Sequence, residues 1–180
     1  NKLQDLPIPE EILEIAAKLQ ENKFEVYLVG GCLRDILMGR APKDWDIATN
    51  ATPEEILKLF PESVYENTFG TVGIKMDTEK ENLKIVEMTT FRLEGKYIDK
   101  RHPDQIKFAS TIDEDLARRD FTVNAFALRL SASKRPELVE GQSIIDPFGG
   151  QADLKNKIIR AVGDPSARFG EDALRLLRAV

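Results

Sequence analysis

The chain has 180 residues, of which 42% are hydrophobic and 32% are charged, and its formal net charge is −5. This composition is typical of a globular protein, and no apolar run approaches the roughly 20 residues that a membrane-spanning helix needs, so no membrane partner is expected. The single cysteine, Cys32, and the single histidine, His102, exclude an internal disulfide, a Cys/His zinc site and catalysis by a Ser-His or Cys-His arrangement.

The first third of the chain alternates between helical and extended patterns. Apolar residues recur at helical spacing after Pro9, and the next run is rich in β-branched and aromatic residues and stops at glycine. Thr52 precedes Pro53 and lies three residues before Glu55, which is the pattern of a capping box. In chain order, these patterns predict a helix over residues 8–22, a strand over 24–30, a short helix over 32–39, a strand over 44–49 and a helix over 53–60.

The remaining chain contains two β-rich runs, 70–76 and 83–91, which predict paired strands. Residues 92–105 are polar, charged and aperiodic, which predicts a long loop of the kind that is more often functional than idle. Because the last apolar pattern has no stop signal, we expect the chain to continue beyond residue 180. The other predicted elements are a helix over 111–119, a strand over 121–130, a loop over 131–137, a turn and short helix over 146–157, a strand over 158–163 and a helix from 165 to the last residue.

Asp44 and Asp46 flank Trp45 in the strand predicted over 44–49. Strand positions two apart face the same side, so the two carboxylates are expected side by side, with Trp45 in the core. Like charges at that spacing repel unless a cation lies between them, and Mg²⁺ prefers one or two carboxylates together with substrate phosphates. Two such ions can hold the attacking and leaving oxygens of a phosphoryl transfer. For this short motif alone, two solvated acids on an edge strand remain the alternative.

Gly30 and Gly31 lie where a predicted strand gives way to a predicted helix. Glycine lets the backbone approach a ligand closely, and a helix N-terminus offers free N–H groups to a phosphate. Arg34, one turn into the helix, could reach the same anion. For the two glycines alone, an ordinary strand-to-helix turn remains the alternative, but a phosphate cradle followed by a carboxylate pair on the next strand favours phosphoryl chemistry.

Three segments, in this order, resemble the motifs of the class II tRNA nucleotidyltransferase and bacterial poly(A) polymerase family. They are LVGGCLRDILMGRAPKDWDIAT at 28–49, DLARRDFTVNAFAL at 115–128 and RFGEDALRLLRAV at 168–180. The resemblance implies an α/β (α+β) fold, with a polymerase-β-like nucleotidyltransferase head and a mixed, mainly antiparallel sheet over residues 1–147. It also implies that residues 148–180 begin an all-helical neck, which contains the region that reads the nucleotide.

The resemblance further implies a role for each matching residue. Asp44 and Asp46 would hold the catalytic Mg²⁺ ions, two in number, and Glu87 is the candidate for a third catalytic carboxylate. Gly31 and Arg34 would contact the triphosphate, and which arginine of the Arg118–Arg119 pair contributes more is left open. The full nucleotide-binding set is Gly30, Gly31, Arg34, Arg118, Arg119, Asp120, Asn124, Glu171, Asp172, Arg175 and Arg178, in which Glu171, Asp172 and Arg175 form a protein template for the base and Arg178 faces the phosphates.

Asp172 and Arg175 are three residues apart, so on a continuous helix they share a face. An acid accepts from an exocyclic amine and an arginine donates to ring nitrogens and carbonyls, a combination that fits C and A but not G and U. One such pair could therefore admit CTP and ATP. From the residues alone, a helix salt bridge worth about a few tenths of a kcal/mol remains the alternative.

The loop over 92–105 resembles the flexible loop of CCA-adding and A-adding members, which argues against a CC-only enzyme. Within it, His102 is expected on the solvated surface rather than in catalysis, and Cys32 is expected to be a small buried filler.

We therefore expect a template-independent nucleotidyltransferase that uses CTP, ATP and Mg²⁺ to add C and A residues to the 3′ end of tRNA. One alternative is an A-adding enzyme or poly(A) polymerase of the same family, and another is a non-catalytic nucleotide- or RNA-binding module. The acidic balance predicts that this chain binds nucleotide but holds tRNA weakly, because tRNA contacts should be basic. The lone cysteine indicates a reducing, cytoplasmic setting.

Overall fold

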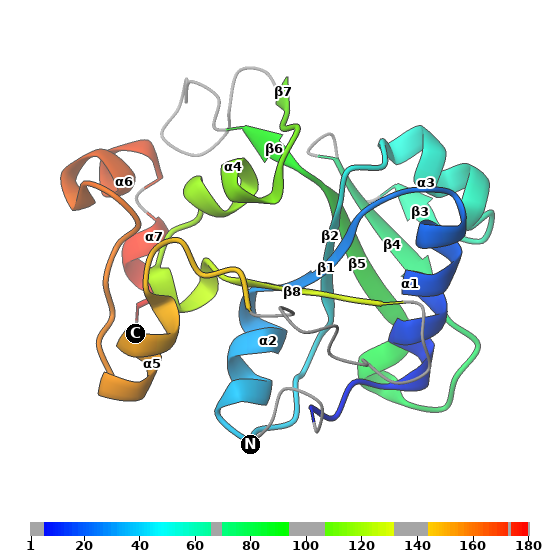
Figure 1. Cartoon of the computed structure of the whole chain (residues 1–180), viewed down its shortest axis with the longest axis horizontal. Coiled ribbons are helices and arrows are strands. Elements are labelled where there is room, and N and C mark those ends of the chain that lie inside the picture. Colours follow the sequence, from blue (N-terminus) through cyan, green and yellow to red (C-terminus); the bar gives the residue numbers. More distant parts are fainter. Residues whose placement is uncertain (1–5, 66–69, 94–106, 132–143, 173, 180) are drawn as a thin grey trace.

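The computed structural model describes residues 6–65, 70–93, 107–131, 144–172 and 174–179. In these residues six strands form one sheet, in the order β3-β4-β5-β2-β1-β8 (Figure 1). β2 runs parallel to β5 and the other neighbours are antiparallel, which confirms the expected mixed, mainly antiparallel sheet. The strands are β1 (Val26–Val29), β2 (Asp46–Thr49), β3 (Val64–Tyr65), β4 (Thr71–Lys75), β5 (Ile85–Thr90) and β8 (Ala127–Arg129).

Three helices, α1 (Glu10–Glu21), α2 (Gly30–Leu37) and α3 (Pro53–Leu59), pack on one face of the sheet. The predicted capping box is present at the start of α3, where Thr52 Oγ1 accepts from the Glu55 N–H and the Glu55 carboxylate accepts from the Thr52 N–H. The apolar stripe of α1 is buried as its spacing predicts, and it joins one core with alternate strand residues: Ile12, Ile15, Ala16, Leu19, Leu28, Ile47, Val72, Ile74, Val86 and Met88.

The opposite face of the sheet is only partly covered. There α4 (Ile112–Ala117) packs against strands β1 and β2, and a separate ribbon of β6 (Arg92–Leu93) and β7 (Lys107–Phe108) lies beside α4 (Figure 1). Along β5, residues that point to this face are exposed or half-buried, whereas their neighbours are buried. The sheet face around the start of β2 and the middle of β5 is therefore open beside α4.

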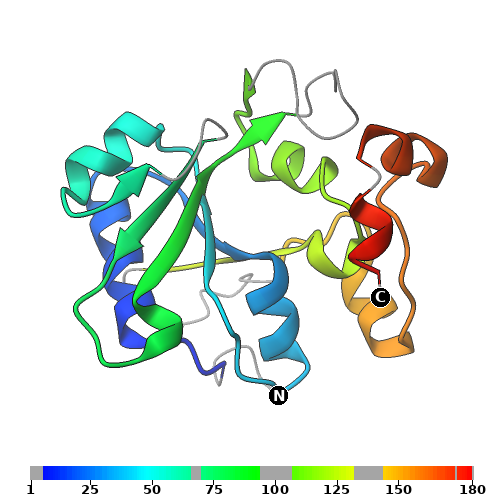
Figure 2. The ribbon, with the colours of Figure 1, turned by 180° about the vertical axis from the view of Figure 1, so that it is seen from behind.

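The C-terminal elements gather on the side of the molecule away from α1 and α3, as both ribbon views show (Figures 1 and 2). They are α5 (Gly150–Asn156), α6 (Pro165–Glu171) and α7 (Leu174–Leu177). No helix in the described ranges combines the length and the apolar character that crossing a bilayer requires.

Gly150 lets α5 lie directly against the short 3-10 helix η3 (Thr122–Asn124). A Cβ atom at Gly150 would stand 2.0 Å from the Thr122 carbonyl oxygen, so no larger residue fits there without movement. Asp153 strengthens this contact, because its carboxylate accepts hydrogen bonds from Thr122 Oγ1 at 2.7 Å and from Arg160 Nε at 2.9 Å. Together these contacts fix the segment around η3 onto α5.

Tertiary packing overrides three of the predicted elements. The strand predicted over 121–130 is η3 followed by the shorter β8, because the Thr122 side chain is bound to α5. The strand predicted over 158–163 makes only one bridge, between Ala161 and Phe121, in the described residues. The helix predicted from 165 onward is broken at Asp172, whose backbone is extended (φ −142°, ψ 107°).

Two predicted boundaries also change. The loop predicted over 92–105 begins as strand β6, and its remainder, with His102, lies outside the described residues. The helix predicted over 32–39 starts at Gly30 as α2, so both glycines lie in its first turn. Gly39 follows the end of α2 with a positive φ of 72°, which is the conformation that favours glycine after a helix.

Candidate active site

The candidate carboxylates meet on the open face of the sheet. Asp46 is the first residue of β2, and Glu87 is its direct neighbour on the parallel strand β5, so the two side chains point to the same face. Asp44 is not on the strand as predicted: it lies in an exposed bend two residues earlier. The strand stops short because only the carbonyl of Trp45 continues the ladder, accepting from the Glu87 N–H at 3.0 Å.

The electrostatics of Asp46 show that these carboxylates repel one another. Burial and, to a smaller extent, the negative charges of Glu87 and Asp44 raise the pKa of Asp46 to about 6, against the opposing effect of Arg119. A cation between the carboxylates would relieve this repulsion. Within the described ranges, no three acidic, histidine or cysteine side chains gather as a preformed metal cage. Mg²⁺ does not need one, since it binds one or two carboxylates together with phosphates.

Gly30 is buried and lies directly beside these acids. Its φ is +69°, and a Cβ atom there would stand 3.0 Å from Asp46 Oδ2 and 3.2 Å from Arg119 Nη1. Gly31 follows in the first turn of α2, close to the Arg34 guanidinium. Arg34 in turn donates from Nη1 to Asn124 Oδ1 at 2.8 Å, which links α2 to η3. The two glycines at the start of α2 and the side chains of Arg34 and Arg119 therefore lie together near Asp46.

Asp115 organises the arginine pair, although the sequence motifs assign it no role. Its Oδ1 accepts from Arg118 Nε at 2.9 Å and Nη2 at 2.7 Å, and its Oδ2 accepts from Arg119 Nη2 at 3.0 Å. The side chain is 1% exposed. A signal was available, because a buried ionised acid requires charge partners and two arginines follow three and four residues later in the sequence.

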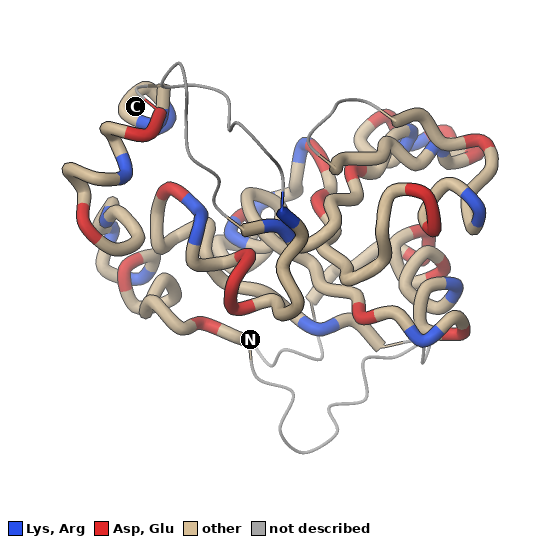
Figure 3. The backbone as a smooth tube through the Cα atoms, turned by 90° about the horizontal axis from the view of Figure 1, so that it is seen from above, with Lys and Arg blue, Asp and Glu red and all other residues tan. Residues whose placement is uncertain are grey.

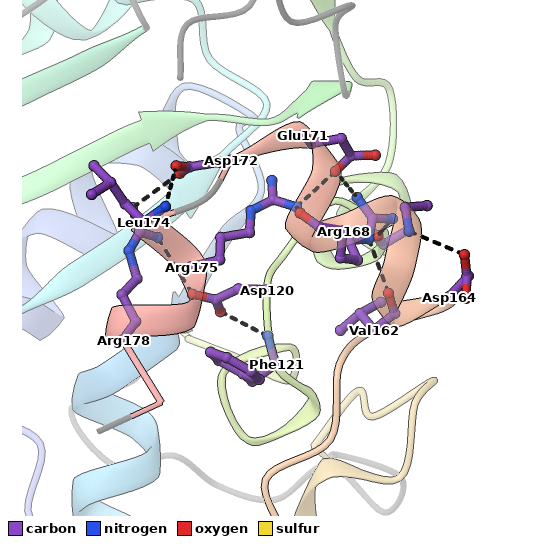
Figure 4. A network of polar contacts seen from close by, with 12 residues as sticks. Asp120, Phe121, Val162, Asp164, Arg168, Glu171, Asp172, Leu174, Arg175 and Arg178 are labelled. Atoms are coloured by element: carbon purple, nitrogen blue, oxygen red, sulfur yellow. Dashed lines mark hydrogen bonds and ion pairs between the residues drawn. The ribbon is translucent and has the colours of Figure 1, made fainter. Parts of the chain in front are cut away.

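Asp120 connects this cluster to the C-terminal helices. Its Oδ1 accepts from the Phe121 N–H at 2.8 Å, and its Oδ2 accepts from Arg178 Nη1 at 3.4 Å (Figure 4). The same Oδ1 also accepts from Asn124 Nδ2 at 3.5 Å. The contacts to Arg178 and Asn124 are long, so they are weak. They nevertheless place the end of α7 beside the segment that carries the arginine pair.

The candidate base-reading residues lie together around the break between α6 and α7 (Figure 4). Asp172 Oδ1 accepts from the Leu174 N–H at 2.9 Å, so this residue starts α7 rather than sharing a helix face with Arg175 as predicted. The Arg175 side chain is 6% exposed, and its Nη1 donates to Glu171 Oε2 at 2.7 Å. Arg178 Nη2 lies 3.8 Å from Asp172 Oδ2.

Arg168 was quoted within a motif but given no role, and the structure places it at the centre of this region. It donates to the Val162 carbonyl at 2.9 Å, to the Ala117 carbonyl at 2.7 Å and to Glu171 Oε2 at 3.2 Å. The Ala117 carbonyl lies at the end of α4, directly before Arg118. Arg168 thus ties the C-terminal helices to the end of α4, which the arginine pair directly follows.

The lone cysteine and tryptophan have the environments expected of core residues. Cys32 is fully buried, its Sγ donates to the Val29 carbonyl at 3.0 Å, and burial raises its pKa to about 12. Trp45 is 2% exposed in the main core.

Charges of both signs are interspersed along the described backbone, so the net negative charge does not mark one side of the molecule (Figure 3). The arginines near Asp46 are therefore a local feature. They offset part of the negative charge of the carboxylates, as the lowering effect of Arg119 on the Asp46 pKa shows.

Comparisons with known proteins agree with this geometry. Residues 26–160 match the family model described as the poly A polymerase head domain. The CCA-adding enzyme of Lactobacillus helveticus is 46% identical over 100% of this chain and 41% of its own length, and that of Streptococcus mutans is 43% identical over 99% and 41%. This chain thus spans about two fifths of the length of the curated relatives it matches.

Two solved structures are similar along nearly the whole chain. The crystal structure of the Bacillus stearothermophilus CCA-adding enzyme in complex with CTP has a TM-score of 0.76 and 38% identity, covering 94% of this chain and 37% of that one. The Thermotoga maritima CCA-adding enzyme complexed with tRNA has a TM-score of 0.71 and 27% identity, covering 97% and 38%.

Proposed function

The chain belongs to the poly(A) polymerase head-domain family, and from that premise we propose that it is the catalytic part of a tRNA nucleotidyltransferase that adds CCA to the 3′ end of tRNA. The similarity to CCA-adding enzymes at 43–46% identity supports this choice within the family. One observation carries the chemistry: Asp46 and Glu87 lie side by side on an open sheet face, next to Gly30 and Arg119. That arrangement suits a metal-assisted attack on a nucleoside triphosphate.

We assign residues 1–147 to the nucleotidyltransferase head and residues 148–180 to the start of the helical neck. The support is the arrangement of the elements: all strands of the main sheet precede residue 147, whereas α5, α6 and α7 follow it. A reducing, cytoplasmic setting fits the tRNA partner and the buried, unpaired Cys32.

In the proposed reaction, the 3′-hydroxyl oxygen of the RNA attacks the α-phosphorus of CTP or ATP, and pyrophosphate leaves with the electrons of the broken P–O bond. Asp44 and Asp46 would hold Mg²⁺, with two ions the expected number, and Glu87 would be the third catalytic carboxylate beside them. When bound, the metal supplies positive charge that makes the hydroxyl a better nucleophile and neutralises the departing pyrophosphate. The raised pKa of Asp46 fits this role, because an acid that is unfavourably ionised gains most from a nearby cation.

The chain's own cations and amides would hold the triphosphate. Gly30 and Gly31 let it approach the first turn of α2, and Arg34 and Arg119 donate to its oxygens from either side. The remaining candidates lie around this triphosphate site. Arg118 would support Arg119 from behind, and Asp120 and Asn124 would contact the ribose.

We assign base reading to Glu171, Asp172, Arg175 and Arg178. Asp172 would accept from the exocyclic amine that C and A share, and Arg175 would donate to the neighbouring ring acceptor. Arg178 extends from this site toward Asp120, and so toward the triphosphate site. The contacts from Arg178 to Asp120 and Asp172, at 3.4 Å and 3.8 Å, are long enough that a bound nucleotide could replace them.

The product formed on defined tRNA ends tests the proposed function. The full-length protein receives tRNA transcripts that end at the discriminator base or after CC, with labelled CTP and ATP and with Mg²⁺. Addition of three nucleotides to the first and one A to the second is expected. An A only on the transcript ending in CC would identify an A-adding enzyme, and a long ladder would identify a poly(A) polymerase. Nucleotide binding without turnover would identify a binding module.

The same assay tests the carboxylates. Asp44→Ala and Asp46→Ala should each remove incorporation, whereas Asp77→Ala, an exposed acid in the turn after β4, should not. Near-normal incorporation by either of the first two variants would overturn the metal-site assignment.

A further inference from the structure

We propose that Asp115 is a positioning residue that orients Arg119 toward the triphosphate. In this proposal Arg118 holds the Asp115 carboxylate in place and is not a second phosphate ligand. The proposal rests on the proposed function, and it assigns different tasks to two neighbouring arginines that sequence motifs treat alike. Three observations carry it: the burial of Asp115, the different ways in which it holds the two arginines, and the close approach of Arg119 to Gly30.

Asp115 is a buried, ionised anchor. Its exposed fraction is 0%, and its two oxygens accept all three hydrogen bonds from the arginine pair that are described above. Burial by itself would raise the pKa of Asp115, but the guanidinium groups of Arg118 and Arg119 outweigh burial and hold that pKa below its usual value. The carboxylate is therefore charged at neutral pH, and charge-assisted bonds of this kind are strong and geometrically specific.

The two guanidinium groups are held differently. Arg118 places both Nε and Nη2 on Asp115 Oδ1, so one edge of its planar group is fixed against the carboxylate. Arg119 uses only Nη2 for Asp115, at 3.0 Å. Its Nη1 lies 3.2 Å from the position a Gly30 Cβ would take, and its only hydrogen bond shown, to the Asn124 carbonyl, is long at 3.4 Å.

Arg119 also has an unused donor. Its Nε is buried and finds no hydrogen-bond partner in the part of the chain that the structure describes. A buried donor without a partner is costly, so it is rare unless a ligand completes it. Nη1, which lies beside Gly30, is therefore placed to donate to a phosphate there, while Nη2 stays on Asp115 and Nε, on the opposite side of the guanidinium from Nη1, can donate to a separate acceptor.

A fourth bond of Asp115 connects this arrangement to strand β6. Its Oδ1 also accepts from the Arg92 N–H at 3.3 Å, at the start of β6. The capping box of Thr111 and Glu114 fixes the start of α4. Asp115 is thus held by both its helix and the adjacent strand, which is the rigidity that a positioning residue needs.

The test compares Asp115→Asn with Asp113→Asn in the full-length protein. Asp113 lies in the same first turn of α4 but is exposed, so both changes remove one negative charge from that turn. Dissociation constants for labelled CTP are measured by equilibrium dialysis in EDTA, where protein contacts alone determine affinity. We expect Asp115→Asn to weaken CTP binding by about tenfold and Asp113→Asn to change it less than twofold.

A double variant distinguishes an effect of Asp115 through Arg119 from a general loss of structure. If Asp115 acts through Arg119, the double variant Asp115→Asn/Arg119→Lys should bind CTP no more weakly than Arg119→Lys. The proposal would be overturned if the losses of CTP affinity in the two single variants multiply in the double variant. It would also be overturned if the CTP affinity of Asp115→Asn lies within twofold of wild type.

A second comparison serves if Asp115→Asn fails to fold. Arg119→Lys should weaken CTP binding by tenfold or more, and Arg118→Lys by less than threefold, although Arg118→Lys lowers the urea midpoint more. Equal losses of affinity would contradict the division of tasks. Failure of tRNA extension by the wild-type protein would instead contradict the proposed function, and the CTP affinities would still test the inference.

Discussion

Replacing Asp46 by Asn should stabilise the folded protein at neutral and alkaline pH, although it removes a residue of the proposed metal site. In the folded chain, burial raises the pKa of Asp46 from 3.8 to about 6, and the Glu87 and Asp44 carboxylates contribute in the same direction. A shift of about two units, at roughly 1.4 kcal/mol per unit, means that ionised Asp46 costs the folded state ~3 kcal/mol. Asn has nearly the same shape and carries no charge, so it avoids this cost.

The effect has a defined dependence on pH. The pKa in the folded state lies above the unfolded value, so the folded state binds this proton more tightly than the unfolded state does. The cost of ionised Asp46 is complete above pH 6, declines as the pH falls through 6 and is absent below 3.8. The stability gained by Asp46→Asn should follow the same course.

Thermal melts in EDTA at pH 8, 6 and 4 measure this gain. At pH 8 the Tm of Asp46→Asn should exceed that of the wild type by roughly 6 to 12 °C, and the difference should vanish at pH 4. Asp44→Asn is the matched control, with a much smaller gain because Asp44 is exposed. Added Mg²⁺ should raise the Tm of the wild type but not of Asp46→Asn. An Asp46→Asn variant that is less stable than wild type at pH 8, or a gain that does not vary with pH, would refute the reasoning.

Two further predictions concern Gly30 and Cys32. Gly30→Ala and Gly39→Ala both place a side chain at a positive φ and should each lower the free energy of unfolding by about 1–2 kcal/mol. Only Gly30→Ala should also abolish nucleotide incorporation, because its Cβ would crowd Asp46, whereas Gly39 has nothing within 4 Å; equal activity of the two variants would contradict this. Cys32, with burial raising its pKa to about 12, should resist a thiol reagent at pH 8 until urea unfolds the protein, and rapid labelling of the native protein would show the thiol to be accessible.

Local sequence signals predicted those parts of the fold that local chemistry determines. The apolar spacing of α1 and the capping box of Thr52 and Glu55 involve residues within one helix, so they are legible without the tertiary structure. The strand-to-helix passage at Gly30 is legible for the same reason, because glycine supplies the backbone conformation required there. The pairing of Asp46 with Glu87 needs a parallel strand register, which a single sequence does not reveal; Glu87 was selected through the family resemblance.

The remaining features arise from contacts between distant segments. The final helix is broken at Asp172, where the Leu174 N–H finds the Asp172 carboxylate and Arg168 reaches carbonyls at Val162 and Ala117. A periodicity argument cannot anticipate such bonds, because apolar spacing is the same on either side of the break. Thr122 likewise leaves the predicted strand because Asp153, far along the chain, accepts its hydroxyl.

The roles of the arginine pair show the limit of motif reasoning. In the sequence Arg118 and Arg119 are two adjacent arginines with no difference between them, and only the geometry around Asp115 and Gly30 distinguishes their roles.

A crystal structure of the full-length protein grown with Mg²⁺ and CTP tests the central claim most directly. The account predicts a divalent ion bound by oxygens of Asp44, Asp46 and the triphosphate, with the phosphates beside Gly30. Carboxylates turned away from the nucleotide, or a triphosphate bound far from the start of α2, would contradict it.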